Sequence, residues 1–132
     1  MSEDYSTDKV EWNMANLLNI ELARLRSKAN DHWINKEYSK AVDTLMAMKM
    51  TGGHVMHKEE RVKLTSIEQQ LEIPLAEYMG ISSVNTNDVM KGRVAVIKVR
   101  RLYLQYNELV MDLLEKYGFL GGRKKDAGRM KI

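Results

Sequence analysis

Residues 86–118 read TNDVMKGRVAVIKVRRLYLQYNELVMDLLEKYG, and this stretch decides the fold class. Apolar residues recur in it at alternating spacings of four and three, namely Ala95, Val99, Leu102, Tyr106, Leu109 and Leu113. This spacing aligns side chains on one face of an α-helix, so it predicts a long helix over 86–118 that ends at Gly118. Further apolar residues widen that face, and they predict that the helix packs on two sides: Val96, Ile97, Tyr103, Val110 and Leu114.

The rest of the chain carries shorter helical patterns. They predict helices over 8–30, over 35–50 and from about 57 onward. Thr51-Gly52-Gly53 is the clearest helix breaker, because paired glycines leave a helix at low cost and permit left-handed backbone. Pro74 removes a backbone donor, so we expect it to end one helix and to begin a short one over 74–79. The predicted fold is therefore all-α: a helical bundle of four main helices plus a short fifth.

A chain of 132 residues has room for one domain. We expect a flexible acidic leader over 1–6, the helical bundle domain over 7–118 and a basic tail over 119–132. The tail carries a net charge of +4, which leaves −1 for the remainder of a chain whose total is +3. The basic character of the protein thus comes from the tail.

Composition excludes several classes of protein. No apolar run is long enough to span a bilayer, and the polar N-terminus does not resemble a secretory signal. The absence of cysteine excludes disulfides, thiolate zinc sites and cysteine nucleophiles. Together with the ten methionines, this predicts a cytoplasmic protein with no membrane partner.

The long helix carries its charges in an unusual order. Basic residues fill its N-terminal half (Lys91, Arg93, Lys98, Arg100 and Arg101), and acidic residues fill its C-terminal half (Glu108, Asp112 and Glu115). The helix dipole favours the reverse order. Three explanations stay open: the bases face an anionic partner, they pair with acids on neighbouring helices such as Glu68, Glu72 and Glu77, or two copies pair antiparallel along this helix.

Residues 74–92 resemble the DNA-binding helix-turn-helix pattern. The resemblance rests on Ala76 as the small residue where two helices cross, Gly80 in the turn, and Ile81 and Val89 as core residues. It implies that a second helix enters the major groove of DNA. In that arrangement the amides of Asn85 and Asn87 would read base edges, while Lys91 and Arg93 would hold phosphates.

The basic tail offers a second anion contact. Its candidate residues are Arg123, Lys124, Lys125 and Arg129. Bases near phosphates give salt-sensitive binding that does not depend on sequence. The alternative is a terminus that only adds solubility.

Catalytic and metal-binding signals are weak. His54 and His57 lie near Glu59 and Glu60, but His54 follows a Gly-Gly loop, so the two imidazoles need not share a helix face. We expect exposed loop histidines, no metal and no cofactor. There is no obvious nucleophilic triad and no glycine-rich phosphate loop, so we expect no enzymatic activity.

The sequence therefore predicts a non-enzymatic binding protein. The leading interpretation is a small oligomeric accessory protein associated with nucleic acid, either DNA or RNA, with a homo-oligomer formed through the long helix. The alternative is a helical structural, assembly or adaptor protein, for example of a viral particle or multiprotein complex, that binds only protein. Trp12, Trp33 and the methionines between 46 and 56 are candidate apolar contacts in such an assembly.

Overall fold

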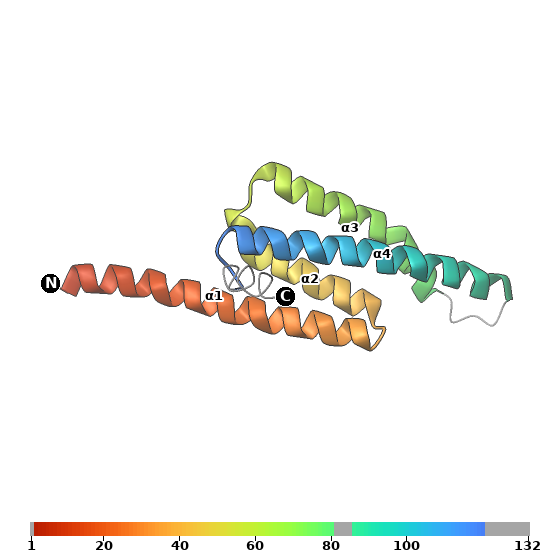
Figure 1. Cartoon of the computed structure of the whole chain (residues 1–132), viewed down its shortest axis with the longest axis horizontal. Coiled ribbons are helices and arrows are strands. Elements are labelled where there is room, and N and C mark those ends of the chain that lie inside the picture. Colours follow the sequence, from red (N-terminus) through yellow and green to blue (C-terminus); the bar gives the residue numbers. More distant parts are fainter. Residues whose placement is uncertain (1, 81–85, 121–132) are drawn as a thin grey trace, which may run out of the picture.

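The computed structural model describes the backbone of residues 2–80 and 86–120 and the side chains of 14, 16–80 and 90–120 (Figure 1). The described residues form four α-helices and one short 3₁₀ helix: α1 (Ser2–Ile34), α2 (Tyr38–Gly52), η1 (Gly53–Val55), α3 (Lys58–Met79) and α4 (Thr86–Lys116). No β-strand occurs within these ranges, which confirms the all-α class. Because α1 begins at Ser2, residues expected to form a flexible leader are helical.

Three helix pairs make the main contacts. α1 packs on α2, α2 also packs on α4, and α3 packs along α4. At one end of the molecule α1 extends past the other helices, and at the opposite end the first turns of α4 project beyond α2 (Figure 1). The projecting end of α4 matters for the surface described below.

The core is built around the predicted face of α4. Ala95, Val99, Leu102, Tyr106 and Leu113 are buried, and Leu109 is half-buried, as the spacing predicted. Tyr103, Val110 and Leu114 are buried as well, so α4 packs on two sides. Ile97 is the exception, because its side chain is 67% exposed on the outer face.

The short fifth helix is not present. α3 continues through Pro74 to Met79, so the prediction that Pro74 would end one helix and start another is wrong. Pro74 itself is buried, and α3 packs against α4. We infer that this packing holds the helix together across the missing backbone donor.

The Gly-Gly pair lies where α2 ends, as the sequence predicted, but not because of left-handed backbone. α2 runs through Thr51 and ends at Gly52, and neither Gly52 nor Gly53 uses left-handed backbone. Gly52 is instead required by close packing, because a Cβ there would collide with the Leu114 side chain of α4. The glycine therefore allows α2 and α4 to approach each other.

Two helix ends show where the chain turns. α1 continues to Ile34, beyond the predicted end near 30, and Lys36 then adopts a left-handed φ of 61°. α4 ends as predicted before Gly118, whose φ of 91° favours glycine. Beyond it, Phe119 is buried in the core, and the Leu120 N–H donates to Asn19 Oδ1 at 2.8 Å. These two residues of the expected tail thus hold the C-terminal end of α4 against α1.

Over the described residues, no helix has the length and apolar content needed to cross a membrane.

Candidate nucleic-acid interface

The basic half of α4 lies on the surface. Lys91, Arg93, Lys98, Arg100 and Arg101 are all exposed. Residues seven apart share one row of a helix, so Lys91 and Lys98 form one row and Arg93 and Arg100 form another. At 1.5 Å per residue, the five cations span about 15 Å along the helix axis. The cations are thus spread around the exposed side of one helix segment, with exposed apolar residues between the two rows.

None of these five cations has an ion-pair partner within the part of the chain that the structure describes. No ion pair there involves Lys91, Arg93, Lys98 or Arg101, whereas Glu68, one of the α3 acids proposed to pair with them, is already bonded to Lys49 and Tyr106. Among the described residues, pairing with neighbouring helices therefore does not explain the charge order of α4.

Arg100 has a different contact, which joins the basic surface to the core. Its guanidinium carbon lies 5.6 Å from the ring centroid of Trp33 in α1, a cation–π distance. Trp33 is stacked on Tyr103 of α4, with ring centroids 4.4 Å apart and planes at 13°. Trp33 also meets Tyr38 of α2 edge-on at 5.3 Å, and Tyr38 meets Tyr78 of α3 at 5.4 Å. One ring from each helix thus forms a continuous aromatic chain.

Sequence reasoning missed this aromatic chain. It named Trp33 only as a candidate apolar contact with a partner; the structure shows Trp33 half-buried and in contact with rings of the same chain. The four rings come from four separate helices. No spacing along the sequence signals their contact, because it depends on how the helices pack.

The remaining predicted contacts lie largely outside the described residues. Asn85, Arg123, Lys124, Lys125 and Arg129 fall there entirely. Asn87 belongs to α4, but its side chain is not described.

The helix-turn-helix resemblance loses one of its structural supports. Ala76 is exposed, so the expected crossing of two helices at this small residue is not present. The helix that would enter the groove is α4 (Thr86–Lys116). Much of the length of this helix is packed in the core.

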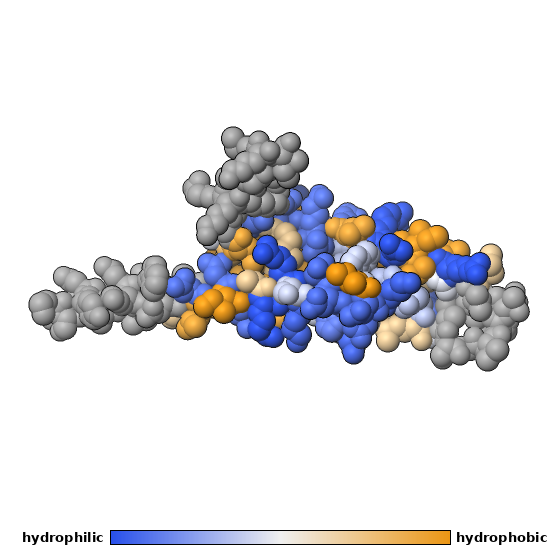
Figure 2. Space-filling model, turned by 60° about the horizontal axis from the view of Figure 1, so that its bottom comes forward, coloured by the Kyte–Doolittle hydropathy of each residue, from blue (hydrophilic) through white to orange (hydrophobic). Residues whose placement is uncertain are grey.

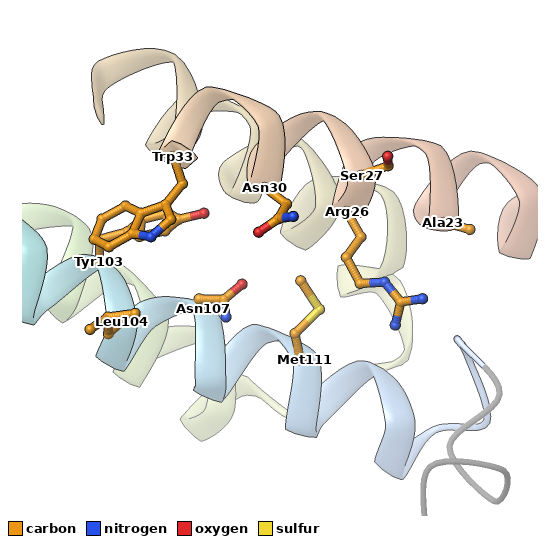
Figure 3. A pocket seen from close by; sticks show the side chains of 9 residues that line it. All are labelled: Ala23, Arg26, Ser27, Asn30, Trp33, Tyr103, Leu104, Asn107 and Met111. Carbon is orange, nitrogen blue, oxygen red and sulfur yellow. The ribbon is translucent and has the colours of Figure 1, made fainter. Parts of the chain in front are cut away.

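A cleft of about 510 Å³ lies between α1 and α4, close to the aromatic chain (Figure 3). Arg26, Ser27 and Asn30 line it from α1, and Asn107 and Met111 line it from α4, with Trp33 and Tyr103 at one end (Figure 3). Among the described residues that line the cleft there is no Asp, Glu or His.

Glu60, one of the residues considered for a metal, has a structural role, and His54, His57 and Glu59 are exposed. Glu60 accepts hydrogen bonds from Lys116 Nζ at 2.6 Å, from the Tyr117 hydroxyl at 2.7 Å and from the His57 backbone N–H at 2.8 Å. The Lys116 bond, followed by those from Tyr117 and His57, lowers the pKa of Glu60 to about 2. Among the described side chains, no three His, Asp or Glu residues are placed to hold a metal ion.

A second polar cluster ties α2, α3 and α4 together. Lys49 Nζ donates to Glu68 Oε2 at 2.7 Å, and the Tyr106 hydroxyl donates to the same oxygen. Burial, then the bond to Glu68, holds the pKa of Tyr106 well above its usual range. Within the described residues, no buried side-chain nitrogen or oxygen lacks a hydrogen-bond partner.

Comparison with known proteins adds no assignment. No protein-family model matches the chain, and no curated protein or solved structure matches it either.

Proposed function

We propose that this protein is a non-enzymatic accessory protein that binds nucleic acid through the N-terminal half of α4. The observation that carries the proposal is the set of five exposed cations between residues 91 and 101, none of which has an ion pair among the described side chains. A surface of one sign attracts a polyanion and orients its approach. The basic tail, with Arg123, Lys124, Lys125 and Arg129, adds charge of the same sign.

The size of the surface sets the expected strength and salt dependence. Phosphates follow one another at about 3.4 Å along each strand, so a basic segment of about 15 Å faces several of them. Each neutralised phosphate releases counterions, and the logarithm of the binding constant falls with the logarithm of the salt concentration by about 0.9 per contact. Five contacts therefore predict a slope of about −4 to −5.

The test is fluorescence anisotropy of labelled mixed-sequence duplex DNA and RNA over a range of salt concentrations. The triple variant Arg93→Gln/Lys98→Gln/Arg101→Gln removes three exposed cations from α4. We expect it to weaken binding by about tenfold or more and to lower the salt slope by about 3.

The matched control is Lys28→Gln/Lys58→Gln/Lys63→Gln, which removes the same charge from exposed positions of α1 and α3. If the two triple variants weaken binding equally, net charge and not the α4 surface is responsible. If the unmodified protein binds neither nucleic acid at low salt, the proposal is wrong. A comparison of the two probes decides between DNA and RNA.

A second candidate function is a helical assembly or adaptor protein whose partners are proteins. It is favoured by apolar side chains on the same face of α4, because phosphate binding does not require them. Met90, Val94, Ile97 and Leu104 are all exposed there. Both candidate functions suit a cytoplasmic protein, in keeping with the absence of cysteine from the sequence.

A further inference from the structure

The cleft between α1 and α4 contains a tyrosine whose hydroxyl group points into it. The side chain of Tyr103 is only 3% exposed, and its oxygen lies on the cleft side of the ring, toward Asn30 (Figure 3). The hydroxyls of Tyr106 and Tyr117 are bonded to glutamates, whereas that of Tyr103 makes no hydrogen bond to any described residue. Burial raises the pKa of Tyr103 to about 12, so the hydroxyl keeps its proton at neutral pH.

The position of this hydroxyl suits ligand binding. Among the described residues, every fully buried side-chain oxygen has a hydrogen-bond partner, so the Tyr103 oxygen must reach the open space of the cleft. A polar group on a buried side chain normally has a partner. The cleft is therefore the place where a partner for Tyr103 can bind.

Two amides lie beside the hydroxyl. Asn30 of α1 and Asn107 of α4 point toward each other across the cleft (Figure 3). Neither side chain makes a hydrogen bond to another described residue. Each amide offers a donor and an acceptor, so the pair suits a ligand edge that carries both. A carboxylate or phosphate only accepts, and it would leave the amide oxygens without a donor.

A cation lies toward the other end of the cleft. Arg26 precedes Trp33 by seven residues on α1, which is about 10 Å along the helix axis and close to the length of one nucleotide. Arg26 is exposed, and no ion pair among the described residues involves it. Its guanidinium can hold a phosphate through two parallel hydrogen bonds. The cleft thus combines groups for a base edge with a group for a phosphate.

The cleft also differs from the apolar patches of the surface. On the face that Figure 2 shows, hydrophobic residues lie in separate patches within a largely hydrophilic surface. Such patches lack directed donors and acceptors, whereas the cleft sets two aromatic rings beside them. That combination, in a volume of about 510 Å³, is typical of sites for ligands of the size of a nucleotide.

The cleft begins where the α4 cations end. Arg100 lies over Trp33, and Trp33 forms one end of the cleft. A strand that follows the cations from Lys91 to Arg100 therefore arrives at the cleft. A base in a duplex is paired and stacked, and it enters such a site only at the cost of flipping out. A single strand can present its bases without that cost.

We propose that the cleft binds one unpaired nucleotide of a single-stranded DNA or RNA whose neighbouring phosphates lie along the α4 cations. Asn30, Asn107 and the Tyr103 hydroxyl bond to the edge of the base, and Arg26 holds its phosphate. This inference rests on the proposed function and deepens it, because it predicts that the protein prefers single strands to duplexes.

The test compares three labelled probes of one mixed sequence by fluorescence anisotropy, each in a DNA and an RNA form. They are a single strand, the matching duplex, and a single strand with abasic positions that keeps every phosphate. We expect the unmodified protein to bind the intact single strand about tenfold tighter than either of the other probes.

The variant Asn30→Ala/Asn107→Ala removes the two amides. We expect it to bind the intact single strand about tenfold more weakly and to keep its affinity for the duplex and the abasic strand, as well as its salt slope. The matched control is Gln69→Ala/Gln105→Ala, which removes two amides from exposed positions of α3 and α4 outside the cleft. The control should bind all three probes as the unmodified protein does.

The variant Tyr103→Phe separates binding from folding. It keeps the ring that is stacked on Trp33 and removes only the hydroxyl. We expect an unchanged thermal midpoint and a several-fold loss of single-strand affinity. Tyr106→Phe removes a hydroxyl that bonds to Glu68, so it should lower the midpoint. A similar fall for Tyr103→Phe would show that its hydroxyl serves the fold, and it would overturn the role in binding.

The remaining outcomes separate this inference from the proposed function. If the protein binds single strand and duplex equally, or if the amide variant binds like its control, the cleft holds no base and the α4 binding surface still stands. Displacement of the strand by a free mononucleotide at micromolar concentration would show that the cleft takes a nucleotide on its own and not as part of a strand. If no probe binds at low salt, both proposals are wrong.

Discussion

At the scale of a single residue, the carboxylate of Glu60 joins three parts of the chain. It caps the start of α3 through the His57 N–H, and it bonds to Lys116 and Tyr117 at the far end of α4. Because its pKa in the folded protein is about 2, against an ordinary value of 4.5, the folded state binds this proton less readily than the unfolded state. The stability that Glu60 contributes is therefore fully present above pH 4.5 and is lost as the pH falls toward 2.

We expect Glu60→Gln to lower the thermal midpoint at neutral pH and to lose part of the acid sensitivity of the unmodified protein. The measurement is the unfolding midpoint from pH 7 to pH 2, followed by circular dichroism. The gap between the two proteins should narrow below pH 4.5. Glu59→Gln, at an exposed neighbour, serves as the control. A gap that stays constant with pH would show that the Glu60 bonds contribute no proton-linked stability.

Single residues also show how far the sequence could predict the site. In the sequence Glu60 lies close to the predicted start of a helix near 57, and the structure shows that it accepts the His57 N–H at the start of α3. Its bonds to Lys116 and Tyr117 join residues more than fifty positions apart, and no local pattern encodes them. The α4 cations were named as candidate contacts from their charge alone. The contact of Arg100 with Trp33 depends on how α1 packs near α4, so it could not be predicted.

At the scale of helices, the approach of α2 to α4 depends on one glycine. Gly52→Ala would place a methyl group against the Leu114 side chain, which is fully buried. We expect it to destabilise the protein by about 1–3 kcal/mol, as overpacking of a core does. The neighbouring Gly53 is the matched control, because nothing lies within 4 Å of a Cβ built there. Gly53→Ala should change the free energy of unfolding by less than about 0.5 kcal/mol or stabilise slightly.

Denaturant unfolding of the two alanine variants checks this prediction. Equal effects at both positions would mean that Leu114 moves aside without cost and that α2 does not need its glycine. Measuring Leu114→Ala in the Gly52→Ala background tests the pair directly, because removing Leu114 should relieve the collision.

Helical periodicity identified the four α-helices but not all of their limits. The face of α4 was predicted nearly residue by residue because a long amphipathic helix repeats its signal many times. The predicted end of α3 at Pro74 was wrong. The local effect of proline favours a helix break, whereas packing against α4 favours a continuous helix. The break at Gly52 was predicted correctly, but its close contact with Leu114 of α4 depends on helix packing and has no signal in the sequence.

At the scale of the whole molecule, the sequence shows that charge is unevenly distributed along the chain, but it does not show what the charges contact. The order of charges on α4 allowed an anionic partner, internal pairing or a dimer. The structure disfavours internal pairing of the α4 cations, because Glu68 is bonded to Lys49 and Tyr106 and the α4 cations are exposed.

The aromatic chain through Trp33 gives the protein a built-in optical probe. Trp33 is stacked on Tyr103 and meets Tyr38, whose ring in turn meets Tyr78, so its surroundings depend on all four helices at once. Its near-ultraviolet dichroism and fluorescence therefore report the docking of the helices, whereas far-ultraviolet dichroism reports only that helices exist. A state that keeps its helices but loses their packing would lose the near-ultraviolet dichroism signal and keep the far-ultraviolet signal.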